Sequence, residues 1–189
     1  MTTSILKGKR IELRMPEHDK DFPLFERWSY DTEFMRLWGA GPVSILTKDL
    51  QQFFLENGMQ AGVVFNICLV DTGQVIGQVD LEEFNPQVGN AWLGIGIGER
   101  SFWNNGYGSE AMQILIRYGF EMLGLERISL NVFGFNQRAV RVYEKLGFKI
   151  EGRVREFGER DGQRWDLVYM GLLREEWNDN KVSELRGEV

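Results

Sequence analysis

The 189-residue sequence contains only one cysteine and one histidine, and this scarcity excludes several kinds of chemistry. Cys68 has no partner for a disulfide bond or a two-thiol site, and its apolar surroundings predict an inert buried thiol. His18 is the only imidazole, so zinc sites and Ser-His-Asp or Cys-His catalysis lack their usual ligands and bases. We therefore expect no metal site and no hydrolase of these types.

Long apolar runs and an excess of basic residues are also missing. No segment approaches the roughly 18 apolar residues that a membrane-spanning helix requires, and the N-terminus lacks the apolar core of a signal peptide. Lys and Arg number 22 against 28 Asp and Glu, which disfavours a broad nucleic-acid surface. We expect a cytoplasmic protein that binds neither membranes nor nucleic acids.

The composition and length are those of one globular domain. Hydrophobic residues make up 43% of the chain and aromatic residues 13%, enough for a sizeable core. A length of 189 residues corresponds to about one domain. We expect this domain to cover residues 1–177 and to be followed by a polar, flexible tail at 178–189.

Hydrophobic periodicity divides the chain into alternating strands and helices. The resulting order is a strand, two helices, a three-strand meander, a helix, a strand, a helix and two final strands, which predicts an α+β fold with a mixed sheet. Asp161 and Gly162 form the predicted turn of the last hairpin. The expected strands are 10–14, 63–71, 75–84, 91–98, 127–133, 149–157 and 165–172, and the expected helices are 22–30, one from Thr47, 109–123 and 136–146.

The segment from Trp103 to Glu110, WNNGYGSE, has the features of a phosphate-binding loop. Gly106 and Gly108 lack Cβ atoms, so the chain can turn tightly and direct successive N–H groups at one anion. The helix that we expect to begin at Ser109 adds its unpaired N–H groups and the positive end of its dipole. Glycines also interrupt the preceding strand, 91–98, which suggests that a ligand approaches its backbone closely.

Two nucleotide-binding motifs fit this loop poorly. Gly106, Gly108 and Ala111 satisfy G-x-G-x-x-G/A, but seven residues separate them from the preceding strand, and no acidic residue ends the following strand. The P-loop motif G-x-x-x-x-G-K-S/T is absent. The loop therefore favours a phosphate-bearing carrier other than NAD or ATP.

The loop, together with the later segment ISLNVFGFNQRAVRVYEKLGF, resembles the GNAT superfamily of acetyl-CoA-dependent N-acetyltransferases. The resemblance extends over roughly Lys9 to Trp177. It is most specific at Asn136–Phe148, and it is strongest to the branch with ribosomal-protein N-terminal and spermidine acetyltransferases. It implies a single-domain fold whose mostly antiparallel mixed sheet is flanked by about four helices. It also implies acetyl-CoA as the acetyl donor, without a metal.

The resemblance assigns donor-binding roles to particular residues. The backbone of Gly96 and Ile97 is expected to bond the pantetheine arm. Trp103 stands where the family pattern has Gln or Arg, so a side-chain contact to the pyrophosphate is lost or is moved to a neighbouring asparagine. Asn136 is expected near the pantetheine and Arg138 near a phosphate. The loop residues expected at the pyrophosphate are Trp103, Asn104, Asn105, Gly106, Tyr107, Gly108 and Ser109.

The same resemblance implies direct attack of an amine on the acetyl carbonyl, with departure of a thiolate. Tyr143 corresponds to the tyrosine beside the thioester sulfur and is expected to be the general acid. For the base, a turn that pairs Phe84 with Ala91 places Glu83 opposite Trp92, which makes Glu83 the candidate. A register shift of one residue substitutes Glu82, and a relay of waters is a further alternative.

The acceptor is less specified by the sequence. Asp80, Glu82 and Glu83 favour a cationic amine, such as a peptide amino terminus, a polyamine or an aminoglycoside. Trp92 and Trp103, which replace polar residues of the family, leave a non-catalytic acyl-CoA-binding or sensor protein as the alternative. The exposed edge strands are compatible with a homodimer.

Overall fold

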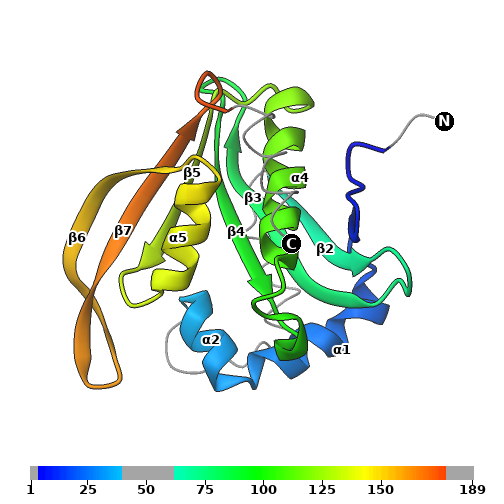
Figure 1. The fold of residues 1–189 in the computed structure, drawn as a ribbon, viewed down its shortest axis with the longest axis horizontal. Helices are drawn as coiled ribbons and strands as arrows, with labels where there is room; N and C mark the ends of the chain where they lie inside the picture. The colour runs from blue at the N-terminus through cyan, green and yellow to red at the C-terminus, as the bar shows by residue number, and fades with distance from the viewer. Residues whose placement is uncertain (1–3, 40–61, 178–189) are drawn as a thin grey trace.

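The computed structural model describes residues 4–39 and 62–177 (Figure 1). These residues form one seven-stranded sheet and four α-helices, which confirms the predicted α+β fold. The helix expected from Thr47 and the tail at 178–189 lie outside the described residues. The strands are β1 (Ile11–Arg14), β2 (Val63–Leu69), β3 (Val75–Asn85), β4 (Asn90–Ile97), β5 (Arg127–Phe133), β6 (Lys149–Arg160) and β7 (Gln163–Leu173). The helices are α1 (His18–Ser29), α2 (Thr32–Trp38), α4 (Tyr107–Glu121) and α5 (Gln137–Lys145), with a 3-10 turn, η1, at Arg100–Phe102.

The sheet has the order β1-β2-β3-β4-β5-β7-β6, and β4 and β5 are its one parallel pair of neighbours in the described chain. These two strands pair only where Asn90–Trp92 lies beside Arg127–Ser129. Beyond Trp92 they separate, so they meet near the top of Figure 1 and diverge below. Within residues 4–39 and 62–177, the edge of β4 that faces β5 therefore has no strand partner from Leu93 onward.

The two faces of the sheet carry different layers. Helix α4 covers one face, where Leu93 of β4, Leu115 and Phe120 of α4 and Leu130 of β5 belong to one buried apolar cluster. On the other face, a smaller cluster joins Trp28, Phe34 and Met35 of α1 and α2 to Cys68 of β2 and Val75 of β3. Burial of these side chains is the main favourable term in folding. No helix within residues 4–39 and 62–177 is long and apolar enough to span a membrane.

Helix α2 was not predicted from the sequence. The Asp31 side chain accepts a hydrogen bond from the Phe34 N–H at 2.9 Å and so caps its first turn. Gly39 ends the helix in the left-handed conformation, with φ of 87°. Both end signals are present in the sequence, but only seven residues lie between them, too few for a clear apolar period.

The last hairpin forms as predicted. Asp161 and Gly162 have φ values of 57° and 73°, and Arg160 pairs with Gln163 across them. Positive φ at both central residues is the conformation that a two-residue hairpin turn prefers, and Asp-Gly accommodates it at low cost. The hairpin carries Phe157 to the site described next.

Candidate active site

The loop before α4 forms the anion-binding geometry that its glycines predict. Gly106 is the N-cap of α4 and has φ of 79°, in the left-handed region that favours glycine. The helix begins at Tyr107, two residues earlier than expected. The N–H groups of Tyr107, Gly108 and Ser109 precede the first intrahelical hydrogen bond, from Glu110 N to Gly106 O, and can therefore bind an external anion.

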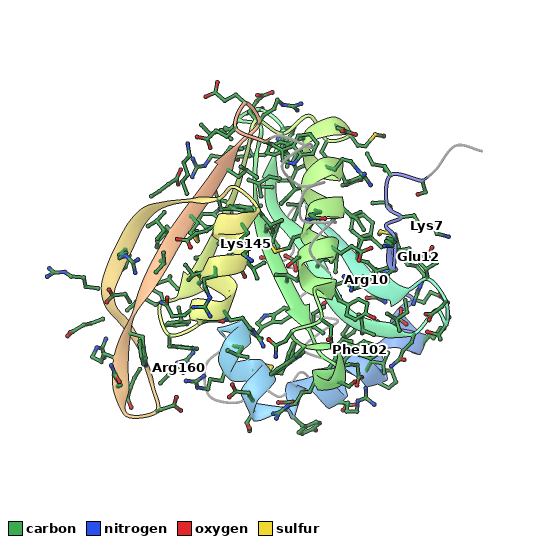
Figure 2. The ribbon with its side chains drawn as sticks, in the orientation of Figure 1. Lys7, Arg10, Glu12, Phe102, Lys145 and Arg160 are labelled. Atoms are coloured by element: carbon green, nitrogen blue, oxygen red, sulfur yellow. The ribbon has the colours of Figure 1, made fainter. Side chains whose placement is uncertain are left out.

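Arg10, which the sequence did not single out, holds this loop in place from the start of β1. Its Nη1 donates to the Asn105 carbonyl at 2.8 Å, and its Nε lies 2.8 Å from Glu110 Oε2. Its guanidinium carbon lies 4.6 Å from the centre of the Tyr107 ring. Arg10 thus reaches the start of α4 from a distant part of the chain, whereas the Phe102 ring, 5.4 Å from that of Tyr107, packs there from the turn just before the helix (Figure 2).

Trp103 supports the loop instead of offering a charge to a phosphate. Its indole Nε1 donates to the Ile97 carbonyl at 2.6 Å, which ties the loop to the end of β4. The guanidinium carbons of Arg100 and Arg138 lie 5.6 and 5.1 Å from the centre of its ring. Arg138 Nη1 also donates to Asn104 Oδ1 at 3.1 Å. These contacts hold Arg138, a cation from α5, at the loop that leads into the unpaired N–H groups of α4.

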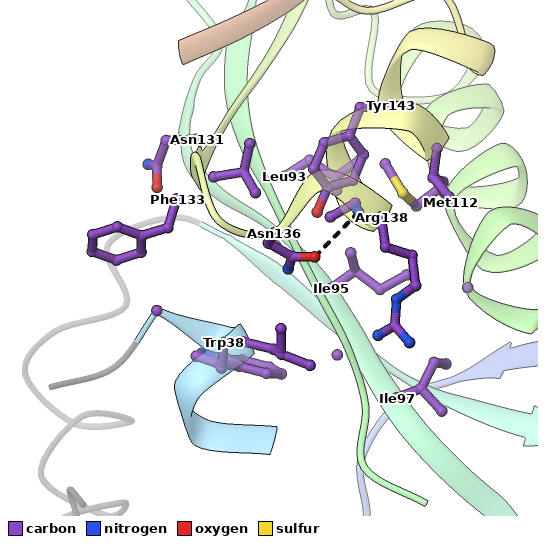
Figure 3. Close-up of a pocket in the computed structure, with 18 of the residues that line it drawn as sticks. Trp38, Leu93, Ile95, Ile97, Met112, Asn131, Phe133, Asn136, Arg138 and Tyr143 are labelled. Atoms are coloured by element: carbon purple, nitrogen blue, oxygen red, sulfur yellow. Dashed lines mark hydrogen bonds between the residues drawn. The ribbon is translucent and has the colours of Figure 1, made fainter. Parts of the chain in front are cut away.

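A cavity of about 880 Å³ occupies the gap between the separating strands β4 and β5 (Figure 3). Side chains alternate between the two faces of a strand. Leu93, Ile95 and Ile97 point to the α4 side, whereas Trp92 points to the opposite side. The part lined by α4, α5 and these three residues is where the family resemblance places acetyl-CoA, and we call it the donor half. The part on the opposite face of the sheet is lined by Trp38, Asp80, Trp92, Phe133, Phe157 and Tyr169, and we call it the acceptor half.

Helix α5 contributes three of the predicted residues to the donor half. Asn136 caps the helix, since its Oδ1 accepts from the Ala139 N–H at 3.2 Å (Figure 3). Its amide Nδ2 remains as a donor. Arg138 and Tyr143 line the same cavity. Burial raises the pKa of Tyr143 to about 12, against the opposing effect of Arg138, so the phenol keeps its proton at neutral pH.

Gly94 and Gly96 of β4, and Gly98 just after it, leave room for other side chains of the protein. A Cβ atom on Gly96 would lie 2.0 Å from Trp38 Cζ3, and one on Gly98 would lie 2.0 Å from Trp28 Cδ2. The place of a Gly94 side chain is filled by the carboxylate of Asp80. The close approach inferred from these glycines is real, but packing on the acceptor face accounts for it. The edge of β4 that faces β5 is separate from this face.

The expected position of Glu83 is wrong. Glu82, not Glu83, is the residue opposite Trp92, and the register between β3 and β4 shifts between Glu82 and Asn85. Glu83 lies in this irregular segment with φ of 50°. Both residues still line the cavity. Asn85 pairs with Asn90 next to the turn, but β3 has one extra residue between Asn85 and Glu82, and this shifts the pairing by one residue. The alternative register, with Glu82 opposite Trp92, is therefore correct.

Asp80 is the most buried of the three acidic residues on β3. Its side chain is 6% exposed, lines the cavity and accepts a hydrogen bond from the Gly94 N–H. Burial and the nearby charge of Glu82 raise its pKa to about 7, while the Gly94 hydrogen bond opposes this. Burial also raises the pKa of Glu82. No arginine or lysine in the described part of the chain neutralises Asp80.

Comparisons with known proteins agree with this geometry. The family profile described as acetyltransferase (GNAT) domain matches residues 10–149. The chain is 29% identical over 175 residues to the uncharacterized N-acetyltransferase p20 of Bacillus licheniformis, covering 91% of this chain and 97% of that protein. It is 33% identical over 116 residues to the L-amino acid N-acetyltransferase AaaT of Escherichia coli (strain K12), covering 60% and 70% of the two chains.

A solved structure has the same fold. It is the spermidine N-acetyltransferase from Vibrio cholerae in complex with CoA and spermine, with a TM-score of 0.80 and 24% identity over 89% of this chain and 98% of that chain. Its likeness bears on the fold, whereas the family profile spans most of the sequence. The chain belongs to the GNAT family and is an acyl-CoA-dependent N-acetyltransferase.

Proposed function

We propose that the protein transfers an acetyl group from acetyl-CoA to a primary amine, by direct attack while both substrates are bound. The observation that carries this proposal is the cavity at the gap between β4 and β5, because its two halves lie on opposite faces of the sheet. A donor and an acceptor can therefore meet without a covalent enzyme intermediate.

The residues of the donor half fit a pyrophosphate joined to a pantetheine arm. Gly106 holds a conformation that exposes the first N–H groups of α4, and Arg138 supplies a positive charge beside them. The unpaired edge of β4 offers backbone groups to the arm, and Asn136 Nδ2 offers a further donor. The Ile97 carbonyl already accepts from Trp103, so we assign the role expected of Ile97 to its N–H group. When bound, acetyl-CoA supplies the activated acetyl group.

Proton transfer falls to one residue on each side of the gap. Tyr143, whose pKa of about 12 keeps the phenol protonated, donates a proton to the departing sulfur as the general acid. We assign the acceptance of the ammonium proton to Asp80 instead of Glu83. Asp80 is buried in the acceptor half, has a pKa of about 7 and lacks a cationic partner in the described chain. A base of that pKa is well matched to neutral pH.

The two tryptophans that motivated a non-catalytic alternative both have structural partners. Trp103 hydrogen-bonds the end of β4, and the Trp92 ring lies 5.9 Å from that of Tyr169 in an edge-on contact. Their presence therefore gives no reason to infer a loss of activity. A cytoplasmic location remains part of the proposal.

The proposal is tested by the release of free CoA thiol from acetyl-CoA in the presence of peptides, polyamines and aminoglycosides. We expect release that depends on an acceptor and product that carries the acetyl group on nitrogen. Tight binding of acetyl-CoA without release in any acceptor class would favour the non-catalytic alternative. A failure to bind acetyl-CoA would contradict the assignment of the donor half.

Replacing Arg138 by alanine is expected to raise the KM for acetyl-CoA about 10- to 100-fold, with a smaller effect on kcat. The reason is the loss of a charge-assisted contact to a phosphate, which contributes about 1.5–3 kcal/mol. Steady-state kinetics with varied acetyl-CoA measure this effect. Arg141→Ala, on an exposed part of the same helix, is the matched control and should leave the KM within twofold. Equal effects of both substitutions would contradict the role of Arg138.

A further inference from the structure

Aromatic side chains line much of the acceptor half of the cavity, and this composition bears on which amine the enzyme accepts. Its walls contain Trp38 of α2, Trp92 of β4, Phe133 of β5, Phe157 of β6 and Tyr169 of β7. These residues come from five different elements of the fold. What these walls indicate about the acceptor rests on the proposed function and specifies which primary amines the enzyme prefers.

Strand register explains why three of these rings share one face of the sheet. Trp92 lies beside Ser129 in the parallel pair, and Phe133 follows Ser129 by four residues, so both rings point to the same side. Tyr169 is opposite Asn131, which lies between Ser129 and Phe133 in this alternation. The acceptor half is thus a continuous surface that crosses β4, β5 and β7.

The other two rings are partly open to solvent at the cavity. Trp38 is 41% exposed and Phe157 is 52% exposed, high values for large apolar side chains. The Phe157 ring lies 6.0 Å from that of Phe133, so the exposed ring continues the buried wall. Exposed apolar side chains that adjoin a pocket are a common mark of a binding surface. An apolar group of the acceptor would cover both rings and remove them from water.

Among the residues that the structure describes, the negative charge of the acceptor half lies at one end. Asp80, Glu82 and Glu83 all belong to the same stretch of β3, beside Trp92 and Gly94. A buried carboxylate without a cation is costly, and the ammonium group of an amine would neutralise it. The other described residues of these walls are aromatic or apolar, except for Asn131. This arrangement provides for one positive charge at one end and for an uncharged apolar group along the rest.

The described residues of the acceptor half also offer no cation to a carboxylate on the substrate. Arg138 is the only arginine or lysine among the described residues that line the cavity, and it lies in the donor half, beside the phosphate loop. Arg160 packs 5.0 Å from the centre of the Phe133 ring but does not line the cavity. A free amino acid would bring its carboxylate close to the acidic end of β3, where repulsion disfavours it.

We propose that the preferred acceptor is a primary amine with a single positive charge next to an uncharged aromatic or large apolar group. The amino terminus of a peptide that begins with an aromatic residue has this chemistry, and so does an arylalkylamine. Polyamines, with several charges and no ring, match the acceptor half less well. Free amino acids match it less well because of their carboxylate.

The test compares four small acceptors at saturating acetyl-CoA: phenylalaninamide, glycinamide, free phenylalanine and spermidine. We expect kcat/KM for phenylalaninamide to exceed that for each of the other three at least about tenfold, the discrimination that a well-filled apolar pocket provides. Equal or higher kcat/KM for spermidine would overturn the inference, and so would equal values for phenylalaninamide and glycinamide. Thiol release with spermidine alone would uphold the proposed function and contradict this acceptor class. Release with none of the four, nor with a wider amine panel, would contradict the proposed function itself.

A substitution at Phe157 links the preference to the cavity. Phe157→Ala is expected to lower the ratio of kcat/KM for phenylalaninamide over glycinamide at least fivefold, mainly through KM. Phe157→Tyr, which keeps an aromatic ring at this position, is expected to keep the wild-type ratio. Val88→Ala removes a side chain that is 63% exposed on another hairpin and should keep the ratio. A ratio that is unchanged in Phe157→Ala would contradict a role for this wall.

Discussion

Replacing Tyr143 by phenylalanine is expected to lower kcat about 10²-fold or more, while the KM for acetyl-CoA changes little. The substitution removes only the hydroxyl group, so the ring keeps its apolar packing, including its place 6.2 Å from the Phe148 ring. What is lost is the proton that a phenol with a pKa of about 12 retains at neutral pH. Loss of general acid catalysis typically costs 10²- to 10⁴-fold. Steady-state kinetics and direct binding of acetyl-CoA measure the two effects separately.

A second tyrosine provides the control for this experiment. Tyr118 lies on α4 with its ring 5.6 Å from that of Phe65, and it does not line the cavity. Tyr118→Phe makes the same chemical change away from the site and is expected to leave kcat within twofold. If Tyr143→Phe retained more than a third of the wild-type kcat, another group would have to protonate the leaving sulfur.

Replacing Asp80 by asparagine is expected to lower kcat/KM about 10²-fold or more at pH 8. In the wild-type enzyme kcat/KM should rise with pH around a midpoint near 7, because the pKa of Asp80 is about 7 and only the carboxylate can accept the ammonium proton. Asparagine fills nearly the same volume but cannot accept that proton, so this rise should disappear. The measurement is a pH profile of kcat/KM for both proteins.

Glu83→Gln separates Asp80 from the residue first inferred as the base. We expect it to lower kcat/KM less than tenfold and to keep the midpoint near pH 7. If Glu83→Gln removed the rise and Asp80→Asn retained it, the assignment of the base to Asp80 would be wrong.

The same Asp80 substitution is expected to raise stability at alkaline pH. The carboxyl group has an ordinary pKa of 3.8 and a folded-state pKa of about 7, so the folded chain holds the proton more tightly. The free energy of unfolding therefore falls as the pH rises from about 4 to above 7, by at most about 4 kcal/mol. Asparagine carries no charge and avoids this loss. Thermal unfolding should show a higher Tm for Asp80→Asn than for wild type at pH 8, and no such gain at pH 4. An equal gain at both pH values would show that charge is not the cause.

The parts of the fold that could be predicted from sequence have local causes. Strand β5 has the predicted bounds, and α5 follows Asn136, whose side chain caps it as expected. The turn at Asp161 and Gly162 depends on the backbone preferences of those two residues alone. The loop at Gly106 was likewise recognisable, because positive φ and exposed N–H groups follow from glycine before a helix.

The parts that could not be predicted depend on contacts between distant residues. Arg10 supports the Asn105 carbonyl across 95 residues of sequence, and nothing near Arg10 indicates that contact. The irregular backbone at Glu83 shifts the register between β3 and β4 by one residue. The alternation of apolar and polar residues in the sequence does not reveal such a shift. The glycines of β4 indicated a close approach, but the approaching rings come from α1 and α2.

The separation of β4 from β5 means that the proposed sites for the two substrates belong to largely different parts of the chain. The proposed donor contacts come from α4, α5 and the loop at Trp103–Ser109, whereas the proposed acceptor walls come from α2, β6 and β7 together with one face of the central strands. Substitutions at Trp38 or Phe157 can therefore change the preferred amine without disturbing the donor site. Such a division lets new acceptor specificities arise by drift or by design on an unchanged catalytic frame.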